Sequence, residues 1–140
     1  MARDIRHFDI QVAKFAKKLN LAVVTLQRMV ALKVFTKLVQ GNPVDTGRAR
    51  ASWTVNVNRP NRAVKPPKPS GTVAYPEPPF PEVQVKLGET IWISNSLPYI
   101  FSLEQGHSGQ APNGWIRVSV EEVRQELRGL ERAAAKATGL

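Results

Sequence analysis

The sequence predicts an α+β fold, in which a long N-terminal helix and a C-terminal helix pack on a small antiparallel sheet. Apolar residues recur every three or four positions over residues 8–38 and again after Trp115, which is the period of amphipathic helices. Between these regions, short stretches alternate apolar with polar residues, as half-buried strands do. A chain of 140 residues is the size of one domain, so we expect residues 1–140 to form a single domain.

The N-terminal helix is predicted from one unbroken apolar stripe. The stripe contains Phe8, Val12, Phe15, Leu19, Val23, Leu26, Val30, Val34 and Leu38. Lysine and arginine occupy mostly other angles, so the helix is amphipathic and basic. Its roughly 33 residues would extend about 50 Å, which is long for a domain of this size. Further apolar residues over 21–39 form a second apolar face, which suggests oligomerisation unless one domain buries both faces.

The helix should end near Gln40, because Gly41 can take a left-handed conformation and Pro43 cannot continue the hydrogen-bond ladder. Residues 45–47 (Asp45, Thr46 and Gly47) then predict a turn. A short carboxylate can bond backbone amides two residues on, and glycine tolerates a positive φ. Polar and apolar residues alternate over 48–57, which predicts a strand.

Residues 58–81 contain eight of the 11 prolines of the chain. Proline at this density favours an extended, polyproline-like backbone without internal hydrogen bonds. We therefore expect an extended, proline-rich arm at about residues 58–82 that is loose in the free protein and contributes nothing to the core. Its first half is basic through Arg59, Arg62, Lys65 and Lys68.

Order returns with an alternating segment at 83–87, a turn at Gly88 and Glu89, and a second segment at 90–94, which together predict a hairpin. Pro98 suits the first turn of a short helix that carries Tyr99 and Glu104. We expect Gly106 to end this helix and residues 107–114 to form a loop.

The C-terminal helix is predicted from Ile116, Val120, Val123, Leu127 and Leu130, which step by three or four residues. A strand over 116–120 is the alternative, but the helical pattern is longer and Gly139 follows where a helix would end. Glutamate and arginine alternate on this helix, which indicates a solvated face with local ion pairs.

Composition narrows the classes of function. The chain has no cysteine, and His7 and His107 lie far apart in the sequence, so we expect no disulfide, metal or cofactor. No charge-free apolar run is long enough to span a bilayer, so we expect no membrane partner and a protein made in the cytoplasm. The net charge is +9, and residues 1–50 carry ten Lys or Arg against three Asp. Such an excess attracts nucleic acid, an acidic membrane surface or an acidic partner, or forms a solvated face.

The segment 106–109 (Gly-His-Ser-Gly) resembles the nucleophile elbow G-x-S-x-G, but Gln110 stands in the fifth position. The elbow also needs an entering strand and a leaving helix, whereas a short helix precedes this segment and a loop follows. The sequence has no glycine-rich phosphate loop and no two-histidine metal spacing. We therefore expect no catalytic residues and no enzymatic activity.

Two segments together resemble a known group of proteins. They are VDTGRARASW at 44–53 and ISNSLPYIFSLEQGHSGQAPNGWIR at 93–117. They are similar to the tail-component families of long-tailed bacteriophages, which include the minor tail protein Z, or tail-completion, type. In those families a D-T-G-x-x-R/A-S-W stretch follows the first helix. A second stretch, N-x-x-P-Y-x-x-x-L-E-x-G-H-S-x-Q-A-P-x-G, precedes the last helix. The proline-rich arm belongs to neither pattern.

The resemblance implies a structural virion protein of the neck, assembled in the host cytoplasm as a hexameric ring at the head-proximal end of the tail. It implies as partners other copies of the chain, the tail tube or tail terminator protein, the head-completion or connector protein, and viral DNA passing through the lumen. Tail completion and tail termination remain alternatives. We expect matched residues at a subunit or partner interface: Arg48, Arg50, Trp53, Tyr99, Glu104, His107 and Gln110.

The basic residues of the arm, Arg59, Arg62, Lys65 and Lys68, have two alternative roles. The arm lies along a neighbouring subunit or the tail tube, or it faces DNA in the channel. We favour the first, because tightly held phosphates would oppose the passage of DNA. A rival from another class is a basic nucleic-acid-binding protein that contacts phosphates through the N-terminal helix and the arm.

Overall fold

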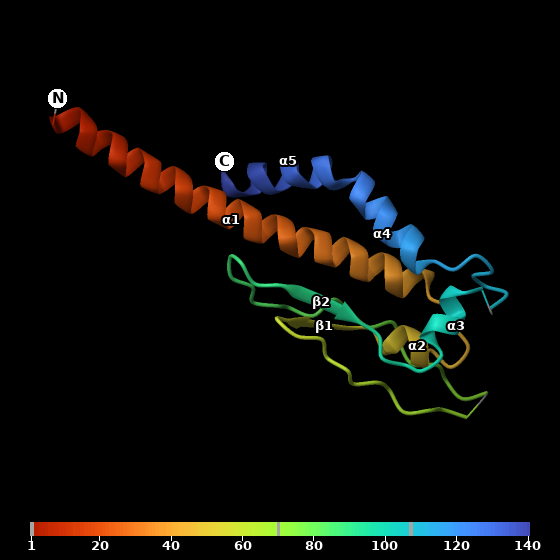
Figure 1. Cartoon of the computed structure of the whole chain (residues 1–140). Helices are drawn as coiled ribbons and strands as arrows, with labels where there is room; N and C mark the ends of the chain where they lie inside the picture. Colours follow the sequence, from red (N-terminus) through yellow and green to blue (C-terminus); the bar gives the residue numbers. More distant parts are fainter. Residues whose placement is uncertain (1, 70, 107) are drawn as a thin grey trace.

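The computed structural model describes residues 2–69, 71–106 and 108–140, and it confirms the α+β fold (Figure 1). A long helix, α1, lies between a two-stranded sheet on one side and two C-terminal helices on the other (Figure 1). The elements in order are α1 (Ala2–Gly41), α2 (Arg48–Ala51), β1 (Thr54–Val57), β2 (Ile91–Ser94), α3 (Ile100–Glu104), α4 (Ile116–Gln125) and α5 (Leu127–Thr138).

Helix α1 is longer than predicted, with 40 residues, because it begins at Ala2. Its C-terminal half supplies the core, where Phe35, Leu38 and Val39 are buried together with Trp53 and Trp115. Ala31 and Phe35, which lie off the main apolar stripe, are also buried. The domain therefore buries much of the second apolar face itself. The N-terminal half extends beyond the sheet (Figure 1), and residues 12–21 are all exposed.

By length and composition alone, the segment Val12–Gly41 could cross a membrane, with a mean hydropathy of 1.3 in its most apolar window. The sequence-based expectation was limited to apolar runs without charges, whereas this window is apolar on average and has at most two charged residues. The core helix of a soluble protein meets the same criterion. In this fold the C-terminal half of α1 contributes to the core, but only 17% of the apolar window is buried; its Gln27 side chain donates a hydrogen bond to the Glu89 carbonyl.

The end of α1 differs from the prediction in one respect. Gly41 is the last helical residue and lies outside the left-handed region, so the predicted left-handed cap at this position is wrong. Gly41 instead allows a close approach, because a Cβ there would lie 2.9 Å from Cδ1 of Trp115. The left-handed residue of this connection is Gly47, with φ of 75°, as the predicted turn requires.

The strand predicted from Arg48 is wrong over its first half, where Arg48–Ala51 forms the short helix α2. The amide of Ala51 donates to the Gly47 carbonyl at 2.8 Å and closes a helical turn. The Ser52 hydroxyl donates to the Arg48 carbonyl at 2.7 Å. The left-handed Gly47 thus starts a helical turn, and alternation over only four residues could not distinguish this turn from a strand.

The predicted hairpin is wrong in its pairing. β2 pairs antiparallel with β1, with Thr54 opposite Ser94 and Val57 opposite Ile91. The turn itself is present, since the Glu89 amide donates to the Lys86 carbonyl at 3.1 Å. Residues 83–87 form no strand and are held against α1, where Arg28 Nη2 donates to the Val83 carbonyl at 3.2 Å.

The arm has no helix or strand in its described residues, as predicted, and it runs from β1 past α2 and back to β2 (Figure 1). Asn58 fixes its start, because its amide donates to the Thr90 carbonyl at 2.7 Å. The expectation that the arm contributes nothing to the core is wrong at Phe80. This ring packs edge-to-face on Phe35, with centroids 5.6 Å apart.

The predicted C-terminal helix is present as two helices, because the chain bends at Glu126 between α4 and α5. Gly139 ends α5 with φ of 74°, as predicted. The acidic residues do more than form local pairs. Glu122 accepts a hydrogen bond from Lys37 Nζ at 2.8 Å and links α4 to α1, and Glu126 lies 3.5 Å from Lys33 Nζ and links the bend to α1. The bond to Glu122 raises the pKa of Lys37.

Candidate assembly interface

Residues 44–53 and 93–117, which carry the two sequence motifs, meet at the C-terminal end of α1, and we call this region the motif junction. The Val44 amide donates to Gln110 Oε1 at 2.9 Å, and Gln110 Nε2 donates back to the Val44 carbonyl at 2.8 Å. The Asn95 side chain donates to the Ala49 carbonyl at 2.8 Å. The two motifs, far apart in the chain, therefore form one structural unit.

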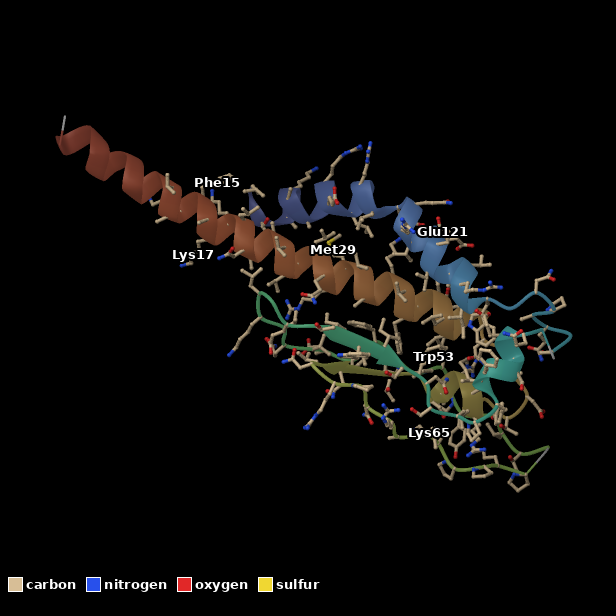
Figure 2. The ribbon with its side chains drawn as sticks, viewed as in Figure 1. Phe15, Lys17, Met29, Trp53, Lys65 and Glu121 are labelled. Carbon is tan, nitrogen blue, oxygen red and sulfur yellow. The ribbon has the colours of Figure 1, made fainter. Side chains whose placement is uncertain are left out.

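Two tryptophans of the motif junction cover the end of α1. Trp53 is buried and donates from Nε1 to Asn42 Oδ1 at 2.8 Å. Trp115 is buried and donates from Nε1 to the Leu38 carbonyl at 2.9 Å, which satisfies a carbonyl in the last turn of the helix. Figure 2 shows Trp53 beneath the C-terminal half of α1. Trp53 is thus a core residue within the chain rather than an exposed docking residue.

Glu104 joins α3 to the N-terminus of α4. Its Oε1 accepts hydrogen bonds from the amides of Trp115 and Ile116 at 2.7 and 2.9 Å, and its Oε2 accepts one from Arg117 at 2.9 Å. Burial acts to raise the pKa of Glu104, but these three backbone bonds outweigh it and hold the pKa below its usual range. The close fit also needs Gly114, since a Cβ there would overlap Glu104.

The arginines of the first motif attach the arm to the motif junction. Arg48 Nε donates to the Lys65 carbonyl at 2.7 Å, and its guanidinium lies 5.9 Å from the centre of the Tyr99 ring. Arg50 Nη2 donates to the Tyr75 carbonyl at 2.8 Å. The Tyr75 amide in turn donates to the Thr46 carbonyl at 2.8 Å. The backbone of the arm is therefore held on the motif junction at Lys65 and at Tyr75.

The turn at Gly47 depends on Thr46 rather than Asp45. The Arg48 amide, just after the turn, donates to Thr46 Oγ1 at 3.3 Å. The predicted bond from this backbone to the Asp45 carboxylate is therefore replaced by one to the Thr46 hydroxyl. A shallow hollow of about 250 Å³ opens beside the turn, between residues 43–49 and the side chains of Tyr99, Ser108 and Gln110. Tyr99 remains 38% exposed there and is available to a partner.

The four basic residues of the arm divide into two pairs. Lys65 and Lys68 lie against Tyr75, with ammonium groups 6.0 and 4.3 Å from the ring centre. Lys68 Nζ also donates to the Val73 carbonyl at 2.7 Å. Arg59 and Arg62 are exposed. The lysines therefore stabilise a bend of the arm, while the arginines present their charge to solvent.

The described residues contain no group of three His, Cys, Asp or Glu side chains that could hold a metal ion. His107 lies outside the described residues. Ser108 Oγ accepts a hydrogen bond from the Gln110 amide at 3.2 Å and so stabilises a loop turn. This bond gives Ser108 a structural role.

Two exposed surfaces were not identified from the sequence as interfaces. One is the N-terminal half of α1, where Val12, Phe15 and Leu19 are 47%, 58% and 42% exposed. The other is the outer side of α4, where Val118 is 54% exposed beside Glu121. The sequence signal that could have identified the surface on α4 is the apolar Val118, which falls outside the apolar stripe of its own helix.

Comparison of the chain with protein-family models, with curated proteins and with solved structures gives no match. The motif junction and these exposed surfaces are therefore the features of the chain that bear on function.

Proposed function

We propose that the chain is a structural protein of a long-tailed bacteriophage virion. In this role, copies of the chain assemble into a hexameric ring at the head-proximal end of the tail. The ring completes or terminates the tail and joins it to the head connector, while viral DNA passes through its centre. The observation that carries the proposal is the motif junction, in which the two motifs that resemble phage tail components form one unit.

The bonding of the motif residues supports a structural role rather than an enzymatic one. Glu104, Gln110 and both tryptophans bond to backbone or side-chain groups of their own chain. These residues position α1, α4 and the arm relative to one another. The exposed apolar residues at the projecting end of α1 support assembly, because monomeric proteins rarely leave such a stripe uncovered.

The test uses the phage that encodes the chain. A stop codon early in its gene should yield filled heads and separate tails, and expression of the chain from a plasmid should restore joined particles. Electron microscopy counts joined particles, and a tagged copy should appear as a ring at the neck. Normal joining of heads to tails without the protein would refute the proposed function.

A nucleic-acid-binding protein is the second candidate, and exposed positive charge favours it. Lys14, Lys17 and Lys18 are exposed on the projecting part of α1, and Arg59 and Arg62 are exposed on the arm. In this function the same residues would contact phosphates directly. The salt dependence of DNA binding separates the two candidates, as argued below.

A further inference from the structure

The projecting part of α1 repeats a pattern that the same helix uses inside the domain. Residues 14–19 read KFAKKL and residues 33–38 read KVFTKL, so each has lysines four apart, each followed by an apolar residue. In the second copy, Lys33 reaches Glu126, at the end of α4, at 3.5 Å, Lys37 reaches Glu122 of α4 at 2.8 Å, and Leu38 is buried in the core. This copy shows that the pattern packs against an acidic helix.

In the first copy, no acidic side chain of the described chain reaches Lys14 or Lys18, and only Gly139 and Leu140 line a hollow beside them. Residues 12–20, which we call the stem, are all exposed. Val12, Phe15 and Leu19 fall within about 60° of one another around the helix, because each residue advances by about 100°. Lys14 and Lys18 border this stripe on the Phe15 side, and the stem contains no acidic residue. The stem is therefore an exposed basic, apolar helix surface, bordered on one side by the C-terminal residues of its own chain.

An acidic groove lies at the other end of the molecule. It has a volume of about 370 Å³ and is lined along α4 by Arg117, Val118, Glu121, Glu122 and Gln125, together with Glu104 and Asn113. Glu104 and Glu122 bond within their own chain. Glu121 is freer, since its pair with Arg124 is 3.9 Å long and both side chains are more than half exposed.

The stem and this groove cannot meet within one chain. Phe15 and Lys37 are 22 residues apart on one continuous helix, or about 33 Å. Lys37 bonds to Glu122, beside the groove. Figure 2 shows Phe15 and Glu121 well apart along the molecule.

We infer that the stem of one copy docks in the α4 groove of the next copy. Phe15 and Leu19 pack on Val118, and Lys14 and Lys18 pair with Glu121. The inference rests on the ring of the proposed function and names the two surfaces that form it. The contact joins unlike patches, so each added copy leaves one stem and one groove free until the ring closes. Pairing of two stems is disfavoured, because it would bring six lysines together.

The absence of cysteine from the sequence allows a direct test by disulfide crosslinking. Two full-length single variants, Lys18→Cys and Glu121→Cys, are mixed and oxidised. A disulfide forms only when the two Cα atoms come within about 7 Å. We expect a crosslinked heterodimer at a rate at least tenfold above that of the control pair, Lys18→Cys with Arg132→Cys, whose second site is exposed on α5. Because all three positions are exposed, the variants should melt like the parent.

The double variant Lys18→Cys/Glu121→Cys should give a ladder of oligomers that ends at the closed ring. A heterodimer rate equal to that of the control overturns the inference. Faster crosslinking of Lys18→Cys to itself overturns it in favour of paired stems. Loss of the heterodimer upon removal of nucleic acid with nuclease also overturns it, because DNA would then bridge the copies.

A charge exchange tests the pairing itself. With Leu19→Cys and Val118→Cys as reporters, Lys18→Glu in the stem copy should slow crosslinking several-fold. Adding Glu121→Lys to the groove copy should restore the rate. Slowing without restoration would contradict the pairing of Lys18 with Glu121. Crosslinking in purified protein and joining of heads to tails in particles are separate measurements, so either can fail while the other succeeds.

Discussion

At the scale of single residues, the matched motifs act mainly on their own chain. Glu104 accepts three backbone hydrogen bonds at the start of α4, and Gln110 bonds Val44 in both directions. Such residues would be recognised from sequence as interfacial or catalytic because they are polar and lie in or next to a loop. Their bonding shows that they shape the surfaces that a partner would meet.

Replacing Glu104 with Gln should lower the free energy of unfolding by about 1 kcal/mol at neutral pH, since its amide group would face the Arg117 amide. The pKa of Glu104 is lowered in the folded chain, so its stabilisation is complete above the unfolded pKa of about 4.3. It is lost as the pH falls from there through the folded pKa. Urea unfolding of parent and variant from pH 7 to pH 3 should show their difference shrink below about pH 4.

The control for this prediction is Glu131→Gln on the exposed side of α5, which should change stability by less than about 0.5 kcal/mol. A difference between parent and Glu104→Gln that stays constant down to pH 3 would contradict the role assigned to the carboxylate.

Gly47→Ala should lower the free energy of unfolding by about 1 to 3 kcal/mol, because alanine is strained in a left-handed conformation. The loss should be larger still, because the new Cβ would press against Tyr75. The φ of Gly47 is 75°, and a Cβ there would lie 2.7 Å from the Tyr75 carbonyl oxygen. Gly71→Ala is the matched control, because Gly71 has φ of 85° but nothing within 4 Å of a Cβ. Thermal melts should rank Gly47→Ala as the less stable variant, and equal melting would show that the contact with Tyr75 contributes nothing.

At the scale of elements, the arm is the part of the structure that differs most from its sequence-based prediction. It lacks regular structure, yet Lys65 and Tyr75 bond to the motif junction and Phe80 packs on the core. An extended, proline-rich segment loses little conformational freedom when it is fixed in this way. The arm therefore stabilises the domain that it surrounds.

Phe80→Ala should lower the free energy of unfolding by about 2 to 3 kcal/mol, near the lower end for phenylalanine because the ring is only half-buried. Val73→Ala on the same arm is the control. Val73 is 85% exposed, so its replacement should change stability by less than about 0.5 kcal/mol. Equal effects of the two substitutions in urea unfolding would mean that the arm is detached from the core in solution.

The periodic parts of the fold were predictable from sequence, and the pairings between distant parts were not. The stripe from Val12 to Leu38 predicts α1 because a helix repeats every 3.6 residues over many turns. The partner of β2 is β1, more than 30 residues earlier, and a local hairpin was the wrong interpretation because alternation does not identify a partner. The arm's attachment rests on backbone carbonyls of Lys65 and Tyr75, which every residue possesses.

The candidate site was predictable in part. The sequence identified the segments of the motif junction, but not that Trp53 is buried or that Glu104 caps α4. The sequence predicted the stem only as part of a long helix, because the exposure of its side chains depends on where the sheet ends beneath α1. Tertiary placement thus decided which predicted residues face solvent.

At the scale of the whole molecule, α1 carries unlike surfaces to the two ends of an elongated domain (Figure 2). The stem is basic and apolar, and the acidic groove lies beside α4. Unlike surfaces on one subunit suit the head-to-tail contact proposed above, in which a ring forms when the rotation between copies closes.

The net charge of +9 gives a prediction for DNA binding. If the chain is the wall of a conduit, its affinity for duplex DNA should be weak, with a slope of log affinity against log salt shallower than about −2. If it is a DNA-binding protein, contacts by five exposed basic residues should give a slope of about −4.5. Neutralising Lys14, Lys17 and Lys18 with glutamine would then reduce that slope by nearly 3, and this result would refute the conduit function.

The central position of α1 also determines the order in which the chain can fold as it is synthesised. Helix α1 leaves the ribosome first, whereas Trp115, α4 and α5, which cover one side of it, follow about 75 residues after its end. At 5 to 20 residues per second, Phe35, Leu38 and Val39 therefore wait roughly 4 to 15 s for that cover. Nascent chains should accordingly engage chaperones during this interval, and a chain truncated before Trp115 should be insoluble.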